Sequence, residues 1–471
     1  MLKLYNTLTK DIEELHKKGH LNLYTCGPTV YNYAHVGNLR SYILADVLYR
    51  TLKYQGYKPK WVMNITDIDD KTIKGTVEKF GKEASVEDLK KFTEEYYQIF
   101  LNDLHEVNVL VKEITFIKVT EVIPQIQDFI IKLMEKGYAY KADDGVYFSI
   151  EKYQKDFGDY SELVGLHFME GKKTGARVKV DEYEKENLSD FALWKAHTPE
   201  DANIFWDHAA LGKGRPGWHI ECSAINQVAF KGQPTDIHTG GVDLIFPHHT
   251  NEIAQSQALL GKGNFVKHWF HSEHLLVDGK KMAKSAKNFY TLKDLQGKIP
   301  LSSLSLRYLF TQTSYRSLQN FTMESLTASY KALEKLYNTL RAHKIIGEKQ
   351  ELQKNIFDGY LKDAAKNLIH DLSIPVFVGQ VWDVLSNKSA NIHTQDAVLE
   401  DFDAILGLSL KNPPSVFNDI ELPAGVKKLV SEREKAREQR NFSESDVLRE
   451  KIEDLGYEVM DGVEGQIVKK N

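Results

Sequence analysis

The feature that most restricts the fold is a strand, turn, helix and second strand near the N-terminus. Residues 21–25 form a short apolar run between two glycine-containing breaks, which predicts a strand that ends in a turn. Helix-like sequence follows from Leu39 to Tyr54, and a second strand is predicted at residues 61–65. This order indicates a parallel βαβ unit. We therefore expect an α/β fold built on a parallel sheet.

The turn after the first strand carries two kinds of chemistry. Cys26 can offer a thiolate to a metal ion. His35, Gly37 and Asn38 form an HxGN motif at the start of the helix, where free N–H groups and the helix dipole favour an anion. Glycine allows a nucleotide to approach closely, and His and Asn can donate hydrogen bonds. Because the motif is short, further motifs elsewhere in the chain are needed to show whether it marks a nucleotide site.

Length, charge and cysteine content exclude several classes of protein. A chain of 471 residues has room for about three domains. Its net charge of −5 excludes a protein that is basic over its whole surface, so nucleic-acid binding requires a local basic face. No apolar run approaches bilayer length, and residues 1–18 contain no signal-peptide core. Because only Cys26 and Cys222 are present, we expect a cytoplasmic protein without disulfides.

The sheet domain is predicted to be interrupted by an insertion and followed by helices. From about Tyr138 to Pro199, short apolar runs are split by charged loops. A further strand is predicted at residues 235–238, and a helix is predicted to open at Pro247. Helical patterns then dominate from Ser302. The predicted domains are 1–120 and 201–270 for the two halves of the sheet domain, 121–200 for a connective insertion, 271–301 for a basic loop region, 302–411 for a helical bundle, and 424–471 for a small C-terminal unit.

Four residues form a candidate metal site. His248 and Glu252 are four residues apart on the predicted helix, so their side chains share one face. With Cys26 and Cys222 they offer two thiolates, an imidazole and a carboxylate, a set that suits zinc. His249, three residues before Glu252, is an alternative ligand. No CxxC pair is present, and an H-x-x-x-E pattern is also typical of a solvated helix face, so spacing alone leaves the site open.

Two basic segments are candidate sites for a nucleotide and for RNA. Lys281 and Lys284 lie three residues apart in a loop and could neutralise charge on a reacting phosphoryl group and on departing pyrophosphate. Near the C-terminus, basic residues interleave with glutamates on one predicted helix, which fits either an RNA contact or a solvated face. These residues are Lys427, Lys428, Arg433, Lys435, Arg437 and Arg440.

These motifs together resemble a known family. Residues 28–38 match the HIGH signature of the class I aminoacyl-tRNA synthetases, and residues 281–285 match their KMSKS signature. Within that class the chain resembles the cysteinyl-tRNA synthetases. The stretches that carry this narrower resemblance are 26–31, 64–71, 217–223 and 240–252, and the resemblance extends from Tyr5 to about Leu455.

The resemblance implies a fold and roles for particular residues. The implied fold is α/β, with a Rossmann-type parallel-sheet catalytic domain, a connective insertion, a helical bundle and a small C-terminal unit on the tRNA side. Asp243 would lie near the substrate amine or the ATP ribose. The other implied roles are zinc binding by Cys26, Cys222, His248 and Glu252; cysteine binding by Gly27, Thr66, Trp218 and His238; ATP binding by His35, Gly37, Asn38, Asp243, Lys281 and Lys284; and catalysis by His35, Asn38, Lys281 and Lys284.

The resemblance also implies a reaction, cofactors and partners. L-Cysteine would be activated by ATP to cysteinyl-adenylate and transferred to the 3′ end of tRNA-Cys. One Zn²⁺ per chain and Mg²⁺ with ATP would be the cofactors, and the chain would act as a monomer away from membranes. Two alternatives share the core: a ligase that joins cysteine to an amino sugar in mycothiol synthesis, and an inactive RNA-binding relative. The predicted bundle and basic C-terminal unit favour tRNA over an amino sugar.

The sequence departs from the family pattern at several positions. Asn38 stands in place of the second histidine of HIGH, and its amide can still donate a hydrogen bond. Ala283 replaces the first serine of KMSKS, and Ala286-Lys287 stands where Leu-Gly is usual. The tail at residues 465–468 lacks the usual tryptophan ending.

Overall fold

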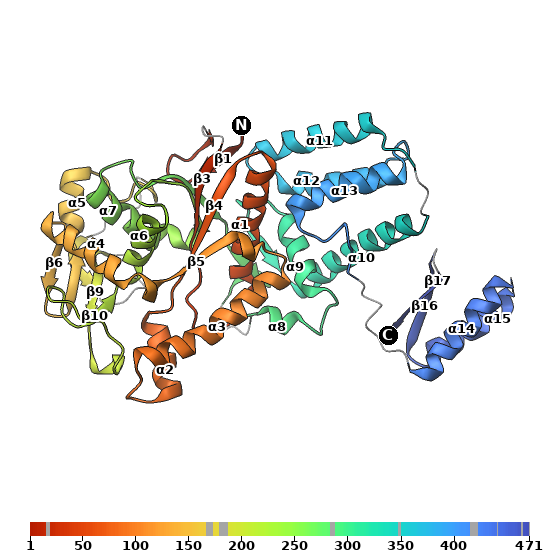
Figure 1. Cartoon of the computed structure of the whole chain (residues 1–471), viewed down its shortest axis with the longest axis horizontal. Helices are drawn as coiled ribbons and strands as arrows, with labels where there is room; N and C mark the ends of the chain where they lie inside the picture. Colours follow the sequence, from red (N-terminus) through yellow and green to blue (C-terminus); the bar gives the residue numbers. More distant parts are fainter. Residues whose placement is uncertain are drawn as a thin grey trace.

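The computed structural model places an α/β domain at the centre of the molecule, with an insertion on one side and helices on the other (Figure 1). The parts of the chain that it describes are residues 1–15, 19–165, 173–178, 187–282, 288–346, 350–414, 423–439, 441–462 and 465–470.

The central sheet is five-stranded and parallel, with strand order β12-β11-β3-β4-β5. Its strands are β3 (His20–Thr25), β4 (Lys58–Ile65), β5 (Ile114–Lys118), β11 (Thr235–Gly241) and β12 (Val266–Ser272). Helix α1 (Val36–Tyr54) joins β3 to β4, which confirms the predicted βαβ unit. Thr25 pairs with Met63 on one side and with Thr239 on the other, so the turn that follows it lies at the carboxyl edge of the sheet. Open α/β sheets bind their ligands at this edge.

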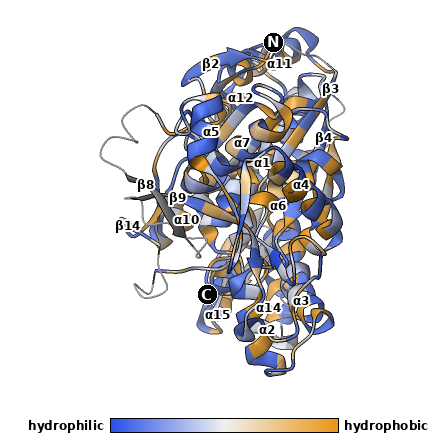
Figure 2. Cartoon of the chain, turned by 90° about the vertical axis from the view of Figure 1, so that its left-hand side faces the viewer, coloured by the Kyte–Doolittle hydropathy of each residue, from blue (hydrophilic) through white to orange (hydrophobic). Residues whose placement is uncertain are grey.

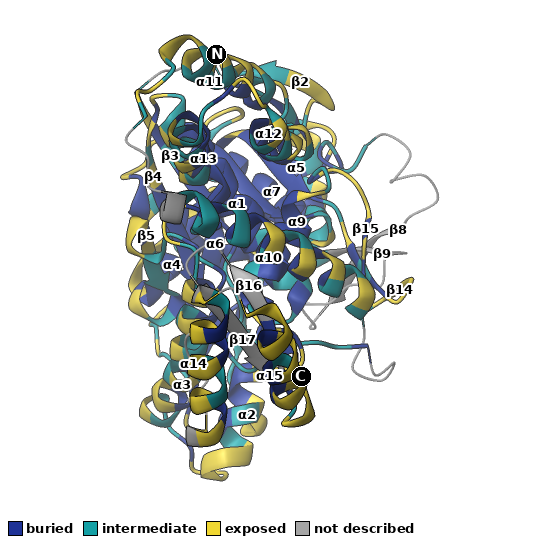
Figure 3. Cartoon of the chain, turned by 90° about the vertical axis from the view of Figure 1, so that its right-hand side faces the viewer, coloured by how far each residue is buried: buried dark blue, intermediate teal, exposed yellow. Residues whose placement is uncertain are grey.

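Helices bury both faces of the sheet. Helix α1 is almost entirely buried, because it packs on the sheet and beneath the helical bundle. Helices α4 (Ile123–Glu135), α6 (Trp218–Ala229) and α7 (Thr250–Leu260) pack together on the insertion side. Figure 2 shows hydrophobic residues along α4 and α6, and Figure 3 shows the centre of the molecule as its most buried part.

The insertion carries a second sheet, of mixed direction. In it, β7 pairs antiparallel with β6 and β9, β10 extends the sheet beyond β9, and β8 runs parallel to β9. The carboxyl end of β4 leads into α2 (Asp70–Phe80) and α3 (Val86–Glu106). The strands of the insertion sheet are β6 (Ala139–Ala142), β7 (Gly145–Phe148), β8 (Lys173–Val178), β9 (Asn187–Ala196) and β10 (Gly214–Pro216). Helix α5 (Ile150–Phe157) lies between β7 and β8 in the chain.

The helix predicted to open at Pro247 is present. The backbone is extended at Phe246 and helical from Pro247 on, first in a wide turn that ends at His249 and then as α7 (Thr250–Leu260). Pro247 therefore begins the helical segment that continues into α7, as predicted. The expected proximity of His248 and Glu252 survives, because the backbone is helical again where the turn joins α7.

Beyond β12 the chain forms a small sheet and then the bundle. Strands β13 (Leu275–Val277) and β14 (Lys280–Lys281) form a hairpin, and β15 (Gln319–Phe321) pairs parallel with β13. The helices that follow are α8 (Leu292–Leu295), α9 (Ser302–Thr311), α10 (Met323–Ile346), α11 (Lys354–Ile369), α12 (Ile374–Ser386) and α13 (Ile392–Leu406). Near the N-terminus, β1 (Lys3–Asn6) pairs with β2 (Asp11–Glu14). Among the described residues, no helix combines the length and apolar character needed to cross a bilayer.

The C-terminal unit has a small core of its own. It contains α14 (Ala424–Glu438), α15 (Phe442–Asp454), β16 (Tyr457–Gly462) and β17 (Gly465–Lys470), and Figure 3 shows α14 and α15 largely exposed. Lys427, Lys428 and Lys435 are exposed on α14, as the basic-face prediction requires. Arg433 is fully buried, which corrects its place in that face, and Arg440 lies outside the described residues.

Candidate active site

The HxGN motif forms the N-terminus of α1. The backbone N–H of Asn38 donates to His35 Nδ1 at 3.0 Å, and the N–H of His35 donates to Asn38 Oδ1 at 3.2 Å, so the two residues cap the helix reciprocally. Because Nδ1 accepts, the neutral imidazole carries its proton on Nε2. Burial lowers the pKa of His35, which favours this neutral form. His35 and Asn38 therefore keep Nε2–H and the amide NH₂ as donors for a ligand.

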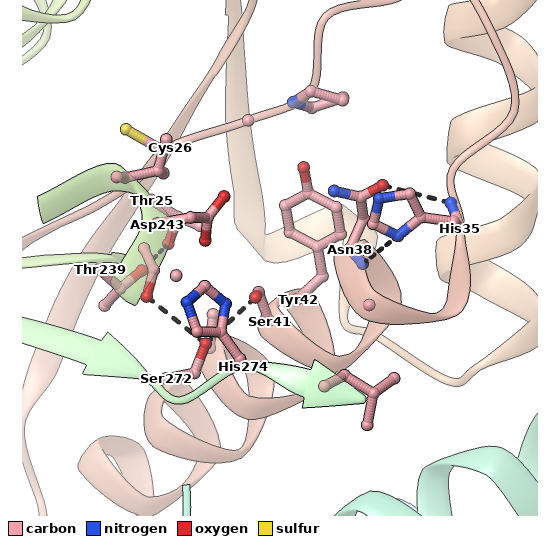
Figure 4. Close-up of a pocket in the computed structure, with 18 of the residues that line it drawn as sticks. Thr25, Cys26, His35, Asn38, Ser41, Tyr42, Thr239, Asp243, Ser272 and His274 are labelled. Carbon is pink, nitrogen blue, oxygen red and sulfur yellow. Dashed lines mark hydrogen bonds between the residues drawn. The ribbon is translucent and has the colours of Figure 1, made fainter. Parts of the chain in front are cut away.

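A cavity of about 340 Å³ opens beside this helix end (Figure 4). It lies between the N-terminal part of α1 and the carboxyl ends of β3, β11 and β12, with the β13–β14 hairpin at its rim. Gly37 keeps the cavity open, because a Cβ there would lie 3.1 Å from the His35 ring and 3.2 Å from Met282 Cε. The lining includes Thr25, Cys26, Gly27, His35, Asn38, Ser41, Tyr42, Thr239, Asp243, Ser272, His274 and Lys281.

The cavity brings together most of the residues predicted to bind ATP. His35, Gly37, Asn38, Asp243 and Lys281 all line it. They come from α1, from the segment after β11 and from β14, which are far apart in the sequence.

Lys284, the other predicted lysine, lies outside the described residues, together with Ala283. Its place relative to the cavity therefore remains a prediction.

A buried cluster of metal-binding side chains adjoins the cavity. Cys26, His248, His249 and Glu252 bring one potential ligand atom each to within 4.8 Å of one another. The Sγ atom of Cys222 is 3.9 Å from that of Cys26, so it belongs to the same cluster. His248 Nε2 lies 3.2 Å from Glu252 Oε1, and His249 Nε2 lies 3.3 Å from Cys26 Sγ. Cys26 is shared, because it lines the cavity as well.

The dimensions of the cluster fit one tetrahedral ion. Two thiolates bound to zinc at about 2.3 Å lie about 3.8 Å apart, close to the observed separation of the two sulfurs. The cysteines are free thiols, and 3.9 Å is far too long for a disulfide. Glu252 Oε1 is buried and lies 3.2 Å from His248 Nε2 without a well-aligned hydrogen bond, so a cation bound by both atoms would stabilise it. The residues present therefore suit a thiophilic divalent metal.

The charges of the cluster are arranged for metal binding. Burial would raise the pKa of the Cys222 thiol, but the Cys26 hydrogen bond and the nearby His248 lower it to about 6. Burial opposes protonation of His248, yet the Cys222 sulfur and Glu252 raise its pKa to about 10. A thiolate and an imidazolium thus face each other, and a divalent cation can replace the imidazolium proton. Burial and neighbouring histidines hold the pKa of His249 well below its usual range, which keeps it neutral.

Of the residues predicted to bind the amino acid, Thr66, Trp218 and His238 lie around this cluster, and Gly27 lines the cavity. The Trp218 ring stacks on His248 with centroids 4.3 Å apart, and His238 Nε2 lies 3.2 Å from Glu252 Oε2. Thr66 donates to Glu221, the residue before Cys222. Gly27 cannot carry a side chain, because a Cβ would lie 1.7 Å from the Asn64 carbonyl oxygen. Trp218 and His238 thus contact members of the cluster, and Thr66 contacts the residue before Cys222. Gly27 follows Cys26 in the chain and lines the cavity.

Sequence reasoning missed several residues of the site. His271 accepts or donates at 2.7 Å to His249 Nδ1 and contacts the Thr7 hydroxyl at 2.8 Å, which fixes the orientation of His249. Ser272, the last residue of β12, and His274 line the cavity. The signal that could have found them is the short run at residues 265–270, which contains several apolar residues, because the carboxyl ends of parallel strands form the ligand-binding edge of an open sheet.

Comparison with known proteins identifies the family. Residues 12–331 match a family described as the tRNA synthetases class I (C) catalytic domain, and residues 419–468 match the cysteinyl-tRNA ligase anticodon-binding domain. A cysteine–tRNA ligase of Chlamydia caviae is 40% identical over 100% of this chain and 98% of its own length. The chain belongs to the cysteine–tRNA ligases.

A second relative agrees with this assignment, and a solved structure agrees with the fold. The cysteine–tRNA ligase of Brachyspira hyodysenteriae is 38% identical and covers 98% of both chains. Among solved structures, a methionyl-tRNA synthetase of Mycobacterium tuberculosis bound by methionyl-adenylate superposes with a TM-score of 0.56. It covers 90% of this chain and 96% of its own, at 12% identity, and so shows the shared fold alone. The predicted α/β class I architecture is therefore confirmed.

Proposed function

We propose that this cysteine–tRNA ligase family member is an active enzyme that attaches L-cysteine to tRNA-Cys. The observation that carries the proposal is that Cys26 belongs to both the nucleotide cavity and the thiol-rich metal cluster. A substrate whose thiol enters the cluster would extend its carboxylate toward the N-terminus of α1. ATP would present its α-phosphate there.

The first step would form cysteinyl-adenylate. A carboxylate oxygen of cysteine attacks the α-phosphorus of ATP, and the bond to the β-phosphate breaks to release pyrophosphate. His35 Nε2–H and the Asn38 amide would donate to phosphate oxygens, assisted by the positive end of α1. Lys281 and Lys284 would neutralise the departing pyrophosphate, and Asp243 would hold the substrate amine or the ribose.

The second step would transfer cysteine to tRNA. A terminal hydroxyl of the tRNA attacks the adenylate carbonyl, and AMP leaves. No side chain has to act as a covalent nucleophile, so positioning and electrostatic stabilisation supply the rate enhancement. The match of residues 419–468 to an anticodon-binding domain supports tRNA over an amino sugar as the acceptor.

We propose Cys26, Cys222, His248 and Glu252 as the ligands of one zinc ion, with His249 as a neighbour. When bound, zinc would supply a soft Lewis acid that takes the substrate sulfur as a thiolate, which a serine hydroxyl matches poorly. Thr66, Trp218 and His238 would hold the rest of the amino acid. Mg²⁺ would accompany ATP, and the enzyme would act as a monomer in the cytoplasm.

Two assays test the function. Cysteine-dependent exchange of labelled pyrophosphate into ATP reports the first step, and charging of a tRNA transcript with a GCA anticodon reports both steps. Exchange and charging are expected with cysteine and absent with serine. Exchange without charging would favour the amino-sugar ligase, and absence of both would favour an inactive RNA-binding relative.

A further inference from the structure

Arg40 is a fully buried arginine one turn into α1. It lies two residues after Asn38, and 1% of its surface is exposed. Its neighbours in sequence face the nucleotide cavity, whereas its own side chain does not line it. A buried guanidinium is costly, so its partners indicate what the charge is used for.

The guanidinium binds two stretches of chain that are distant from it in sequence, at residue 273 and at residues 314–319. Nε donates to Gln319 Oε1 at 3.1 Å in β15. One terminal nitrogen donates to the backbone carbonyl of Glu273, and the other to the carbonyls of Ser317 at 3.1 Å and Ser314 at 3.4 Å. Every one of these acceptors is a neutral oxygen. Although Glu273 acts to raise it, burial lowers the pKa of Arg40 to about 10.

These partners frame the far wall of the cavity. Ser272, Glu273, His274 and Leu275 line the cavity opposite the end of α1. Leu275 pairs with Gln319, and the next residue of β13, Leu276, pairs with Lys281. The N–H of Glu273 also donates to the Tyr315 carbonyl at 2.8 Å, so wall and turn are joined directly. Arg40 thus links the helix that carries His35 and Asn38 to the root of the hairpin that carries Lys281, beside the Ser41–Ser272 hydrogen bond of 3.1 Å.

We infer that Arg40 is a positioning residue for adenylate formation, which holds the α1 end and the Lys281 hairpin at the separation that ATP requires. This inference rests on the proposed function. Adenylate formation needs both halves of the cavity at once, because the end of α1 and Lys281 would act on the same ATP from different walls of the cavity. Transfer to tRNA follows release of pyrophosphate and would no longer need Lys281.

The test compares the two steps in Arg40→Lys. Lysine keeps the charge, but its single ammonium group cannot reach all four of these acceptors as the planar guanidinium does. Loss of fixed geometry at a distance from the chemistry can cost about 10- to 100-fold in rate. We expect kcat for pyrophosphate exchange to fall by this factor, with a smaller change in KM for ATP. Transfer from preformed cysteinyl-adenylate, measured in a single turnover, should stay close to wild type.

Two further variants separate positioning from folding. Gln319→Met removes one acceptor and leaves Arg40 in place, so exchange should fall less but in the same step-specific manner. Arg50→Lys is the matched control, because Arg50 is buried on the same helix and binds Asp46 and two carbonyls away from the cavity. Arg50→Lys should lower the melting temperature and should leave the ratio of the exchange rate to the transfer rate unchanged.

The outcomes are distinguishable. If Arg40→Lys and Gln319→Met slow pyrophosphate exchange and transfer to tRNA by the same factor per active site, the inference is wrong. It is also wrong if these variants slow neither step. In both cases the proposed function of the enzyme stands. If the wild-type chain shows no cysteine-dependent exchange, the proposed function fails and the inference falls with it.

Discussion

At the residue scale, the two cysteines have the clearest consequence. Cys222→Ser should lose most bound zinc, because a hydroxyl is a far poorer ligand than a thiolate. His249→Ala should retain it, since His248 and Glu252 already meet at 3.2 Å. Elemental analysis of protein purified without chelator measures both. If His248→Ala retains the zinc and His249→Ala loses it, then His249 and not His248 is the zinc ligand.

Asp67 predicts a pH dependence of stability. It follows Thr66 and accepts hydrogen bonds from the backbone and hydroxyl of Thr120, which joins the ends of β4 and β5. Burial raises its pKa from 3.8 to about 6, despite the opposing effect of the Thr120 bonds. The folded state then binds the proton more tightly than the unfolded state. The resulting stabilisation is present at low pH and is lost as pH rises from about 4 to about 6.

Asp67→Asn removes this titration. The free energy of unfolding of the wild type minus that of the variant should fall by on the order of 3 kcal/mol between about pH 4 and about pH 7. Melting temperatures across that range would measure the trend. Asp128→Asn, on the exposed face of α4, is the control and should show no comparable slope. A difference that rises with pH would contradict the assigned direction.

At the scale of elements, a buried charge cluster joins α1 to α9. Asp46 in α1 accepts from Arg50 at 2.7 Å and from Arg307 of α9, and all three side chains are buried. Arg307 also donates to the Leu406 carbonyl at 2.6 Å at the end of α13. Helix α1 and the bundle are therefore held together by one carboxylate and two guanidinium groups.

Asp46→Ala would leave two guanidinium groups without their carboxylate. Removing one partner of a buried ion pair typically costs about 3–5 kcal/mol, so the variant should unfold at much lower urea concentration. Asp128→Ala breaks a pair in which both side chains are about half exposed, and should change little. Similar small losses in both variants would show that the cluster is not stabilising.

At the scale of the whole molecule, the candidate active site and the segment that matches an anticodon-binding domain lie in different parts of the chain. The cavity and the metal cluster lie in the α/β domain, whereas the anticodon-binding match lies in residues 419–468. Deleting residues 415–471 should therefore weaken charging and spare cysteine-dependent pyrophosphate exchange. Equal loss of both activities would mean that the C-terminal unit is needed for folding of the catalytic domain.

A charge-reversal pair refines this test without removing the unit. Lys427→Glu with Lys428→Glu alters two exposed residues of α14 and should raise KM for tRNA, because phosphate contacts depend on charge. Glu432→Lys, exposed on the same helix, is the matched control and should not weaken binding.

The sequence by itself determined the local elements and the chemistry they carry. The apolar run of β3, the glycine after it and the helical pattern of α1 act between near neighbours, so the βαβ unit could be read directly. The same holds for the HxGN cap and for the pairing of His248 with Glu252, which lie within one turn of each other. The family resemblance then linked these pieces into one site.

Only the tertiary structure decided which distant groups meet. Cys26 and Cys222 come together because parallel pairing fixes β3 beside β11, and α6 packs against α7. Sequence spacing contains no record of that packing. The burial of Arg433 and the hydrogen-bond partners of Arg40 also depend on contacts made by other segments. Short-range interactions thus fixed the elements, and long-range packing fixed the geometry in which they act.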